Sequence, residues 1–398
     1  MDHDRSSGEG VGVQEYTCIK LKVLENMEDF KVGDVKCGAK LDEIDLKGRH
    51  LFLVAATLRP ETMYGQTNCF VGVDIQYGIY AVSDTEAWMC TERSARNMQY
   101  QHLFEGKELV MLGSLMGRDI VGTRLEAPLA GIVYVLPMEG VLEDKGTGIV
   151  TSVPSDSPDD YITVLDLAKK AAYYQIDRKS NHKYYSFNRL AKWVDIFPIR
   201  SVIKTEKYGD LAAKQVVEQL KIVSQKDKIK LAEAKDLVYK EGFYHGTMCQ
   251  GEFSGLSVQV AKPLVKQLLL QKKVNTIKQH HFDRKMAFVY CEQEGRVITK
   301  NGDECVVSLT DQWYLNYGQE EWKQKGLECL ERMELYSDET RNNFLKVFDW
   351  LGKWACSRSF GLGSRVPWDK KFLIESLSDS TIYMAYYTVA HLLQGFQF

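Results

Sequence analysis

Short apolar runs separated by turn residues occupy residues 51–154 and predict a β-rich region. The run at residues 51–55 is wholly apolar, which is typical of a buried strand, and residues 132–136 and 148–153 are strand candidates of the same kind. Residues 20–23 alternate polar with apolar positions, as a half-buried strand does. The stretch 31–47 is rich in Gly, Lys and Asp and predicts a loop.

Helical patterns follow this region, beginning with residues 160–170. Asp227 is placed to cap a second helix that carries Ile229 and Leu231, and Gly242 is placed to end it. From about residue 261 the pattern changes to longer helices with a few strands. A length of 398 residues suits two domains. The pattern therefore predicts a barrel-like α+β domain followed by a second domain with α/β character.

The nine cysteines favour reduced thiols over disulfides or a metal site. None is paired in a C-x-x-C spacing, and Cys69 and Cys305 stand beside apolar residues. A zinc site needs clustered Cys and His ligands. Only His280 and His281 with Cys291 come near such a cluster, and they lack its spacing.

A formal net charge of −3 argues against a large basic surface for nucleic acid, although it leaves room for a few groups that grip a single-stranded end. No apolar run reaches the ~18 residues of a membrane span. The polar, acidic N-terminus lacks the apolar core of a signal peptide and the Arg/Ser-rich character of a mitochondrial presequence. These features favour a cytoplasmic protein without a membrane partner.

The segment 56–68 (ATLRPETMYGQTN) is the most informative motif in the chain. It follows the apolar run 51–55, so its threonines lie where a strand gives way to a turn. Pro60 prevents a central strand from continuing, and Gly65 permits a tight bend. Clustered hydroxyls around Arg59 suit a polar ligand with an anionic or ester group. Composition alone would be weak evidence, because threonine is common in strands.

This order of residues resembles the threonine-rich segment of the editing domain in the leucyl, isoleucyl and valyl class I aminoacyl-tRNA synthetases. Residues 144–160 (DKGTGIVTSVPSDSPDD) resemble the other half of the same site. Valyl enzymes share parts of both motifs and are the nearest family rival. The stretches 151–160, 95–98 and 373–384 resemble the archaeal and eukaryotic cytosolic leucyl enzymes.

The resemblance runs from residue 14 to residue 393 and implies a piece of a larger synthetase. Residues 1–25 would be entry strands, and residues 26–260 would form the editing domain. Residues 261–398 would be the distal part of the Rossmann-like catalytic domain that the editing domain interrupts. The implied activity is hydrolysis of misacylated tRNA(Leu), because one methylene is worth only ~1–3 kcal/mol and the synthetic site cannot reject isosteres strongly.

The resemblance also implies roles for individual residues. Asp160 would bind the substrate α-ammonium, and Thr57 would position the ester or the attacking water. Thr62 would narrow the pocket against leucine, and Arg59 would meet the ribose-phosphate of the terminal adenosine. Further substrate-binding candidates are Lys145, near the ribose, Gly146, Thr147 and Gly148 in the turn, and Thr151 and Val153 in the pocket wall. Ser380 and Tyr383 would border the leucine pocket of the synthetic site.

Each role has a purely structural alternative. The threonines, together with Val153, fit ordinary strand packing, and a Gly-Thr-Gly sequence usually marks only a turn. Arg59 fits a surface ion pair, and Tyr383 fits helical packing. Acids after Pro158 favour a helix N-terminus, which is the preferred interpretation for Asp156 and Asp159.

Several departures limit what the resemblance implies. The His-Ile-Gly-His and Lys-Met-Ser-Lys-Ser signatures are absent, so ATP with Mg is expected to serve only the full-length parent enzyme, and editing needs no cofactor. Leu58 stands where bacterial leucyl enzymes carry a second threonine, Val13 replaces a proline, and residues 195–202 match only loosely.

The expected partners are the 3′ end of tRNA(Leu), leucine and near-cognate amino acids, and a multi-synthetase complex. Two alternatives stay open: a free-standing trans-editing hydrolase, and a non-catalytic scaffold that binds leucine or a partner protein.

Overall fold

A computed structural model describes residues 11–24, 41, 43–106, 108–169, 198–271, 285–299, 301–359 and 361–395. It divides into two compact units, residues 1–309 and 310–398, which are described separately below. The sequence predicts a boundary after residue 260, but the first unit is longer, because helix α7 (Val258–Gln271) packs on it and strand β12 (Ala287–Gln293) pairs with β1 (Val13–Val23).

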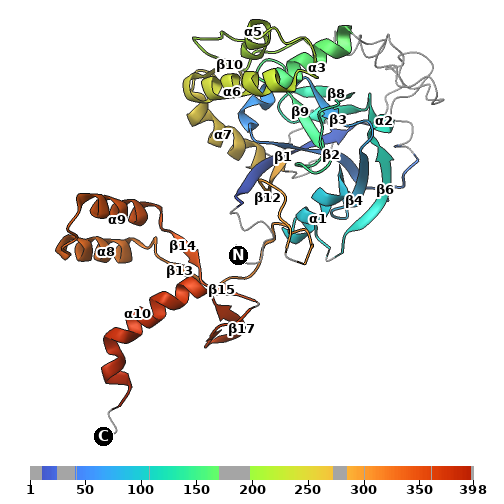
Figure 1. The fold of residues 1–398 in the computed structure, drawn as a ribbon. Coiled ribbons are helices and arrows are strands. Elements are labelled where there is room, and N and C mark those ends of the chain that lie inside the picture. Colours follow the sequence, from blue (N-terminus) through green and yellow to red (C-terminus); the bar gives the residue numbers. More distant parts are fainter. Residues whose placement is uncertain are drawn as a thin grey trace. The chain divides into compact units, whose positions relative to one another are not determined.

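The first unit is built on one large mixed sheet (Figure 1). Its hydrogen-bonded order is β6-β4-β5-β2-β1-β7-β8-β3-β9, and β12 pairs with residues 13–19 of β1. The pairs β2–β5 and β3–β8 are parallel and the others are antiparallel. Besides β1 and β12, the strands are β2 (His50–Thr57), β3 (Asn68–Val71), β4 (Gln76–Ala81), β5 (Glu86–Cys90), β6 (Val110–Met116), β7 (Arg124–Ala127), β8 (Gly131–Pro137) and β9 (Ile149–Ser152).

Helices cover both faces of this sheet. The helix α1 (Glu92–Tyr100) packs over Tyr16, Trp88 and Tyr290, which belong to one apolar cluster. The short helix η2 (Pro60–Gly65) and α7 pack on the main core around Met63. A separate apolar cluster joins α3 (Pro158–Lys169), α5 (Ala212–Gln219) and α6 (Lys228–His245). The remaining elements of this unit are α2 (Gly117–Ile120), β10 (Ile203–Lys204) and β11 (Thr247–Met248).

Most of the strands and helices that the sequence predicts are confirmed, and two details are wrong. The predicted half-buried strand at residues 20–23 is the end of the central strand β1, whose side chains are buried from Tyr16 to Leu21. Lys20 is buried there because Glu86 pairs with it at 2.8 Å. Helix α6 begins after Asp227 as predicted but continues past Gly242 to His245. A Cβ at Gly242 would meet a guanidinium nitrogen of Arg59 at 3.6 Å, an ordinary van der Waals contact, so this part of α6 lies beside Arg59.

The second unit is smaller and has few buried side chains. Its strands form two antiparallel sheets, with the orders β13-β14 and β15-β17-β16. Its elements are β13 (Tyr314–Asn316), α8 (Glu320–Arg332), α9 (Asp338–Trp350), β14 (Lys353–Ala355), β15 (Ser357–Arg358), β16 (Arg365–Val366), β17 (Asp369–Ile374) and α10 (Ser376–Leu393). A parallel Rossmann-like sheet is not seen among the described residues of this unit.

None of the described helices combines the length and apolarity that a membrane span requires. No group of three or more His, Cys, Asp or Glu side chains in the described ranges is arranged to hold a metal ion. The alternative zinc ligands His280 and His281 lie outside the described residues. The loop predicted at 31–47 also falls largely outside them.

Candidate functional site

Three hydrogen bonds, each with at least one backbone group, hold the threonine segment against the segment from Gly146 to Asp160. At one end, the Ala56 amide donates to the Thr147 hydroxyl at 3.3 Å. At the other end of the threonine segment, the Thr67 amide donates to the Ser152 carbonyl at 3.1 Å. Between them, Arg59 Nη1 donates to the Asp156 carbonyl at 3.0 Å. The two motifs, about 90 residues apart in sequence, therefore form one site in the structure.

Thr57 and Thr62 use their hydroxyls in opposite ways. Thr57 ends strand β2, and its oxygen accepts the Arg59 amide at 3.0 Å. No acceptor for the Thr57 hydroxyl proton is recorded among the described residues, so that proton is available to a ligand. The Thr62 hydroxyl donates to the Arg59 carbonyl at 2.8 Å, and its proton is already used. Thr62 can therefore meet a ligand mainly through the size of its side chain, whereas Thr57 can donate a hydrogen bond to a ligand.

Arg59 is largely buried, with its side chain 16% exposed. Its Nε pairs with Glu61 at 3.3 Å, and its guanidinium carbon lies 4.5 Å from the centre of the Tyr239 ring. Burial lowers the pKa of Arg59, but Glu61 and Asp156 outweigh burial and hold this pKa above its usual value. The alternative interpretation, an exposed ion pair, is therefore wrong about exposure. The contacts of Arg59 join the threonine segment to the start of α3 and to α6.

Asp156, in the turn between β9 and α3, and Asp160, in the first turn of α3, are both buried. Burial, partly opposed by Arg59 and Ser155, raises the pKa of Asp156 to about 6. Asp160 is only 6% exposed and accepts the Val153 amide at 2.8 Å. Burial, partly opposed by this Val153 bond, raises the pKa of Asp160 to about 7.

Asp160 has no cation against it among the described residues. Lys235, on α6, pairs instead with the neighbouring Asp159 at 3.2 Å. The Asp159 charge adds to the rise in the pKa of Asp160. A buried carboxyl group with so little compensation would gain from an incoming cation, because the cation stabilises its charged form.

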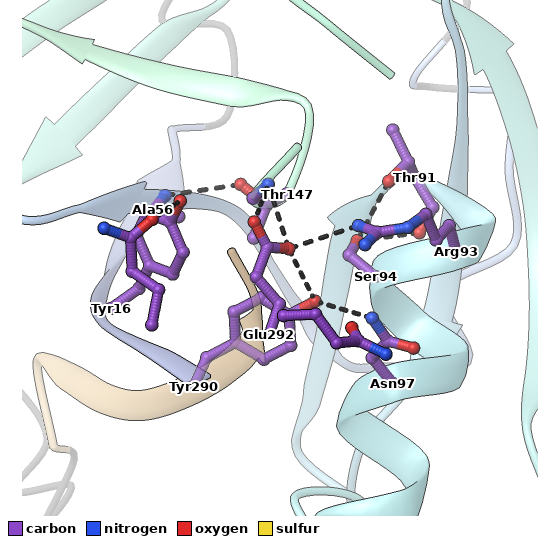
Figure 2. A network of polar contacts seen from close by, with 12 residues as sticks. Tyr16, Ala56, Thr91, Arg93, Ser94, Asn97, Thr147, Tyr290 and Glu292 are labelled. Carbon is purple, nitrogen blue, oxygen red and sulfur yellow. Dashed lines mark hydrogen bonds and ion pairs between the residues drawn. The ribbon is translucent and has the colours of Figure 1, made fainter. Parts of the chain in front are cut away.

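The turn at Gly146, Thr147 and Gly148 is fixed by contacts on every side (Figure 2). Gly146 and Gly148 have φ angles of +59° and +72°, where glycine is favoured. The Tyr77 hydroxyl donates to the Gly148 carbonyl at 2.6 Å, and the Thr91 amide donates to the Thr147 carbonyl at 3.1 Å. Lys145, just before the turn, is exposed.

The pocket-wall candidates occupy different environments. Val153 directly follows β9 and belongs to the main apolar core. Thr151 lies on β9 opposite Cys69 of β3 and is also buried. In the second unit, the Tyr383 hydroxyl donates to Ser380 at 3.0 Å on helix α10, and Tyr383 is exposed. Its ring lies 6.1 Å from the Tyr387 ring on the same helix, a contact that fits the packing role considered for Tyr383.

Known proteins resemble this chain along its length and in its fold. A putative cytoplasmic leucine–tRNA ligase of Schizosaccharomyces pombe is 49% identical over 99% of this chain and 33% of its own length. The cytoplasmic leucine–tRNA ligase of Arabidopsis thaliana is also 49% identical, over 98% of this chain and 33% of its own length. The crystal structure of GlLeuRS-CP1 is 31% identical, with a TM-score of 0.58 over 70% of this chain and 99% of that chain.

The chain belongs to the leucyl-tRNA synthetase family. It spans about a third of the length of the curated relatives that it matches. A solved editing domain from the P. knowlesi cytosolic leucyl-tRNA synthetase is 26% identical, with a TM-score of 0.56 over 71% of this chain and 98% of that domain. No protein-family model matches the chain. The leucyl assignment decides against the valyl rival.

Two buried acids of this chain, Glu61 and Glu292, were not predicted from the sequence. Glu61 is 1% exposed, and its Oε2 has no partner among the described residues. Glu292, on β12, is 2% exposed and accepts the Gly146 amide at 2.9 Å. A signal for Glu292 exists in the strand alternation, because it shares a face with Phe288 and Tyr290 at a spacing of two residues.

Proposed function

We propose that this chain carries the editing site of a cytoplasmic leucyl-tRNA synthetase and hydrolyses misacylated tRNA(Leu). The observation that carries the proposal is that three hydrogen bonds hold the segment with Thr57 and Thr62 against the segment that ends at Asp160. Support also comes from the solved editing domains that share the fold. The barrel-like form of the editing domain and a distal Rossmann-like part are further elements of the proposal.

The roles follow from the side-chain chemistry. The Asp160 carboxylate binds the α-ammonium of the misplaced amino acid, a cation that would lie in direct contact with this buried group. The Thr57 hydroxyl donates to the ester or orients the attacking water. Thr62 limits the room beside the amino-acid side chain, and leucine is excluded by size.

The hydrolysis uses a positioned water and no covalent protein intermediate. The water oxygen bonds to the ester carbonyl carbon, and the bond from that carbon to the ribose oxygen breaks. The ribose oxygen takes a proton, which leaves a free amino acid and tRNA with a free terminal hydroxyl. Positioning of the ester and of the attacking water supplies the rate enhancement.

The parent enzyme would attach leucine to tRNA(Leu) with ATP and Mg, using sequence signatures that this chain lacks. Ser380 and Tyr383 would border its leucine pocket, and Lys145 would lie near the ribose. Editing itself would require no cofactor. The partners are the 3′ end of tRNA(Leu), leucine with near-cognate amino acids, and a multi-synthetase complex.

The test is deacylation of Ile-tRNA(Leu), Val-tRNA(Leu) and Leu-tRNA(Leu) by the 398-residue chain. We expect the first two substrates to lose their amino acid and Leu-tRNA(Leu) to persist. Binding of tRNA(Leu) without loss of any amino acid would favour a silent scaffold and contradict the proposal. Fast loss of leucine as well would contradict the exclusion by Thr62.

A further inference from the structure

We propose that Glu292 is a positioning residue of the editing site. It fixes the Gly146–Gly148 turn and, through this turn, the position of the backbone beside Thr57. This inference rests on the proposed function. Glu292 does not face the ligand; it holds the turn, and the turn in turn holds the strand end that carries Thr57.

A single buried carboxylate joins three separate parts of the first unit (Figure 2). Glu292 Oε1 and Oε2 accept the Gly146 amide at 2.9 and 3.1 Å. Oε2 also accepts Arg93 Nη1 of helix α1 at 3.1 Å and the Tyr290 hydroxyl at 3.3 Å. Strand β12, helix α1 and the turn before β9 therefore meet at one charged group.

The donors around Glu292 are themselves held in place. The Tyr290 hydroxyl accepts Asn97 Nδ2 at 3.1 Å, so its own proton points to Glu292. Burial and the Glu292 charge raise the pKa of Tyr290 well above its usual value, so this hydroxyl keeps its proton. Because these donors hold the Glu292 carboxylate in one position, the carboxylate in turn holds the Gly146 amide in one position.

The turn transmits this geometry to the threonine segment. Strand β2 pairs with β5 only as far as Leu53, so the Ala56 amide needs another acceptor. The Thr147 hydroxyl is that acceptor, at 3.3 Å, and it donates onward to the Ile149 carbonyl at 3.2 Å. Ala56 directly precedes Thr57. A shift of Gly146 therefore moves the hydroxyl that holds the backbone beside Thr57.

Glu304 supplies a matched control, because it shares Arg93 with Glu292 but does not touch the turn. Its Oε1 lies 3.5 Å from Arg93 Nε, and Arg96 and Arg296 lie 3.9 Å from its Oε2. Glu304→Gln therefore weakens the same ion-pair cluster and leaves the Gly146 hydrogen bond intact.

The experiment compares Glu292→Ala, Glu292→Gln and Glu304→Gln in the full chain, by amide hydrogen exchange and by deacylation of Ile-tRNA(Leu). We expect Glu292→Ala to speed exchange at Gly146 at least about 10-fold. Its kcat should fall by about 10- to 100-fold with KM within about twofold, because misplacement near the reacting group slows the reaction more than binding. Glu292→Gln keeps an acceptor and should give intermediate values, and Glu304→Gln should match wild type within about twofold.

Two results would overturn the inference. One is a folded Glu292→Ala protein with wild-type kcat, and the other is an equal loss of kcat in Glu304→Gln. If Glu292→Ala does not fold, the same comparison is made with Glu292→Gln. If the wild-type chain deacylates nothing, the proposed function fails; the positioning of the turn is then decided by exchange at Gly146, where equal exchange in wild type and Glu292→Gln overturns it.

Discussion

Two buried carboxylates flank the segment from Gly146 to Asp160, and they are compensated in opposite ways. Glu292 is surrounded by an amide, a guanidinium and a phenol, all of which donate to it. Asp160 has the Val153 amide and no cation in contact among the described residues. A saturated carboxylate has little left to offer a ligand, whereas an undercompensated one gains from binding a cation. We call the surroundings of Glu292 the supporting corner and the surroundings of Asp160 the ligand-binding corner.

The largest effect is expected at the supporting corner. Glu292→Ala leaves Arg93 without one buried partner and the Gly146 amide without an acceptor. Breaking a buried pair by removing one partner costs about 3–5 kcal/mol of unfolding free energy. Urea denaturation at neutral pH measures this loss. A loss below about 1 kcal/mol would show that the donors find water instead and that Glu292 is not a structural centre.

Local patterns predicted much of the fold around these two corners. The apolar run at residues 51–55 became β2, and the acids after Pro158 opened α3. The pairing of Gln14 with Glu292 could not be predicted, because it joins strands almost 280 residues apart and no local pattern records it. The same pairing places residues 287–293 in the first compact unit, which extends beyond the boundary predicted after residue 260.

The candidate site was predicted only in part. The threonine segment and Asp160 were identified by their order in the sequence. Glu61 and Glu292 were missed because isolated acids are usually exposed, and only three-dimensional contacts show that these two are buried. Arg59 was assigned to a ligand phosphate or to the surface, since its internal partner Asp156 lies on a distant segment.

The ligand-binding corner should respond in the opposite direction to the supporting one. A carboxyl group whose pKa is raised to about 7 in the folded protein destabilises that fold as pH rises from about 4 to about 7. Asp160→Asn removes this effect, so the variant should be more stable than wild type at pH 8, by up to about 4 kcal/mol. The two should differ little near pH 4. Denaturation at both pH values checks the sign.

The same Asp160→Asn variant should lose editing. A charge-assisted hydrogen bond to a charged group is worth about 1.5–3 kcal/mol, which corresponds to roughly a 10- to 150-fold slower deacylation of Ile-tRNA(Leu). A variant that is more stable and less active would confirm that Asp160 binds the ligand and lowers the stability of the unliganded protein. Parent activity in a stabilised variant would remove Asp160 from the site.

A smaller effect is expected from the turn that lies between the corners. Gly148 has a φ of +72°, and a Cβ there would overlap the Thr91 side chain. Gly148→Ala should lower the unfolding free energy by about 1–3 kcal/mol and slow deacylation. Gly131 has a φ of +80° but open space around its Cβ position, so Gly131→Ala should show only the smaller conformational cost. Equal losses in both variants would show that contact with Thr91 contributes nothing.

The smallest effect on stability, and the finest test of the ligand-binding corner, concerns Thr62. Its hydroxyl proton is bound to the Arg59 carbonyl, so the side chain meets a ligand through its shape. Thr62→Val keeps that shape and loses one hydrogen bond, worth about 0.5–1.5 kcal/mol of stability. Thr62→Ala loses the hydrogen bond and also opens the space.

If Thr62 is a steric gate, the two variants should separate in selectivity although both lose the same hydroxyl. Thr62→Val should still spare Leu-tRNA(Leu), whereas Thr62→Ala should hydrolyse it roughly 10- to 200-fold faster than wild type, the range that one methylene of room permits. Both should edit Ile-tRNA(Leu) at rates near wild type, because Asp160 and Thr57 are unchanged. Equal selectivity in the two variants would assign any effect to the hydrogen bond with Arg59. Thr62 would then belong to the supporting framework together with Glu292, and the exclusion of leucine would have to come from another side chain of the pocket.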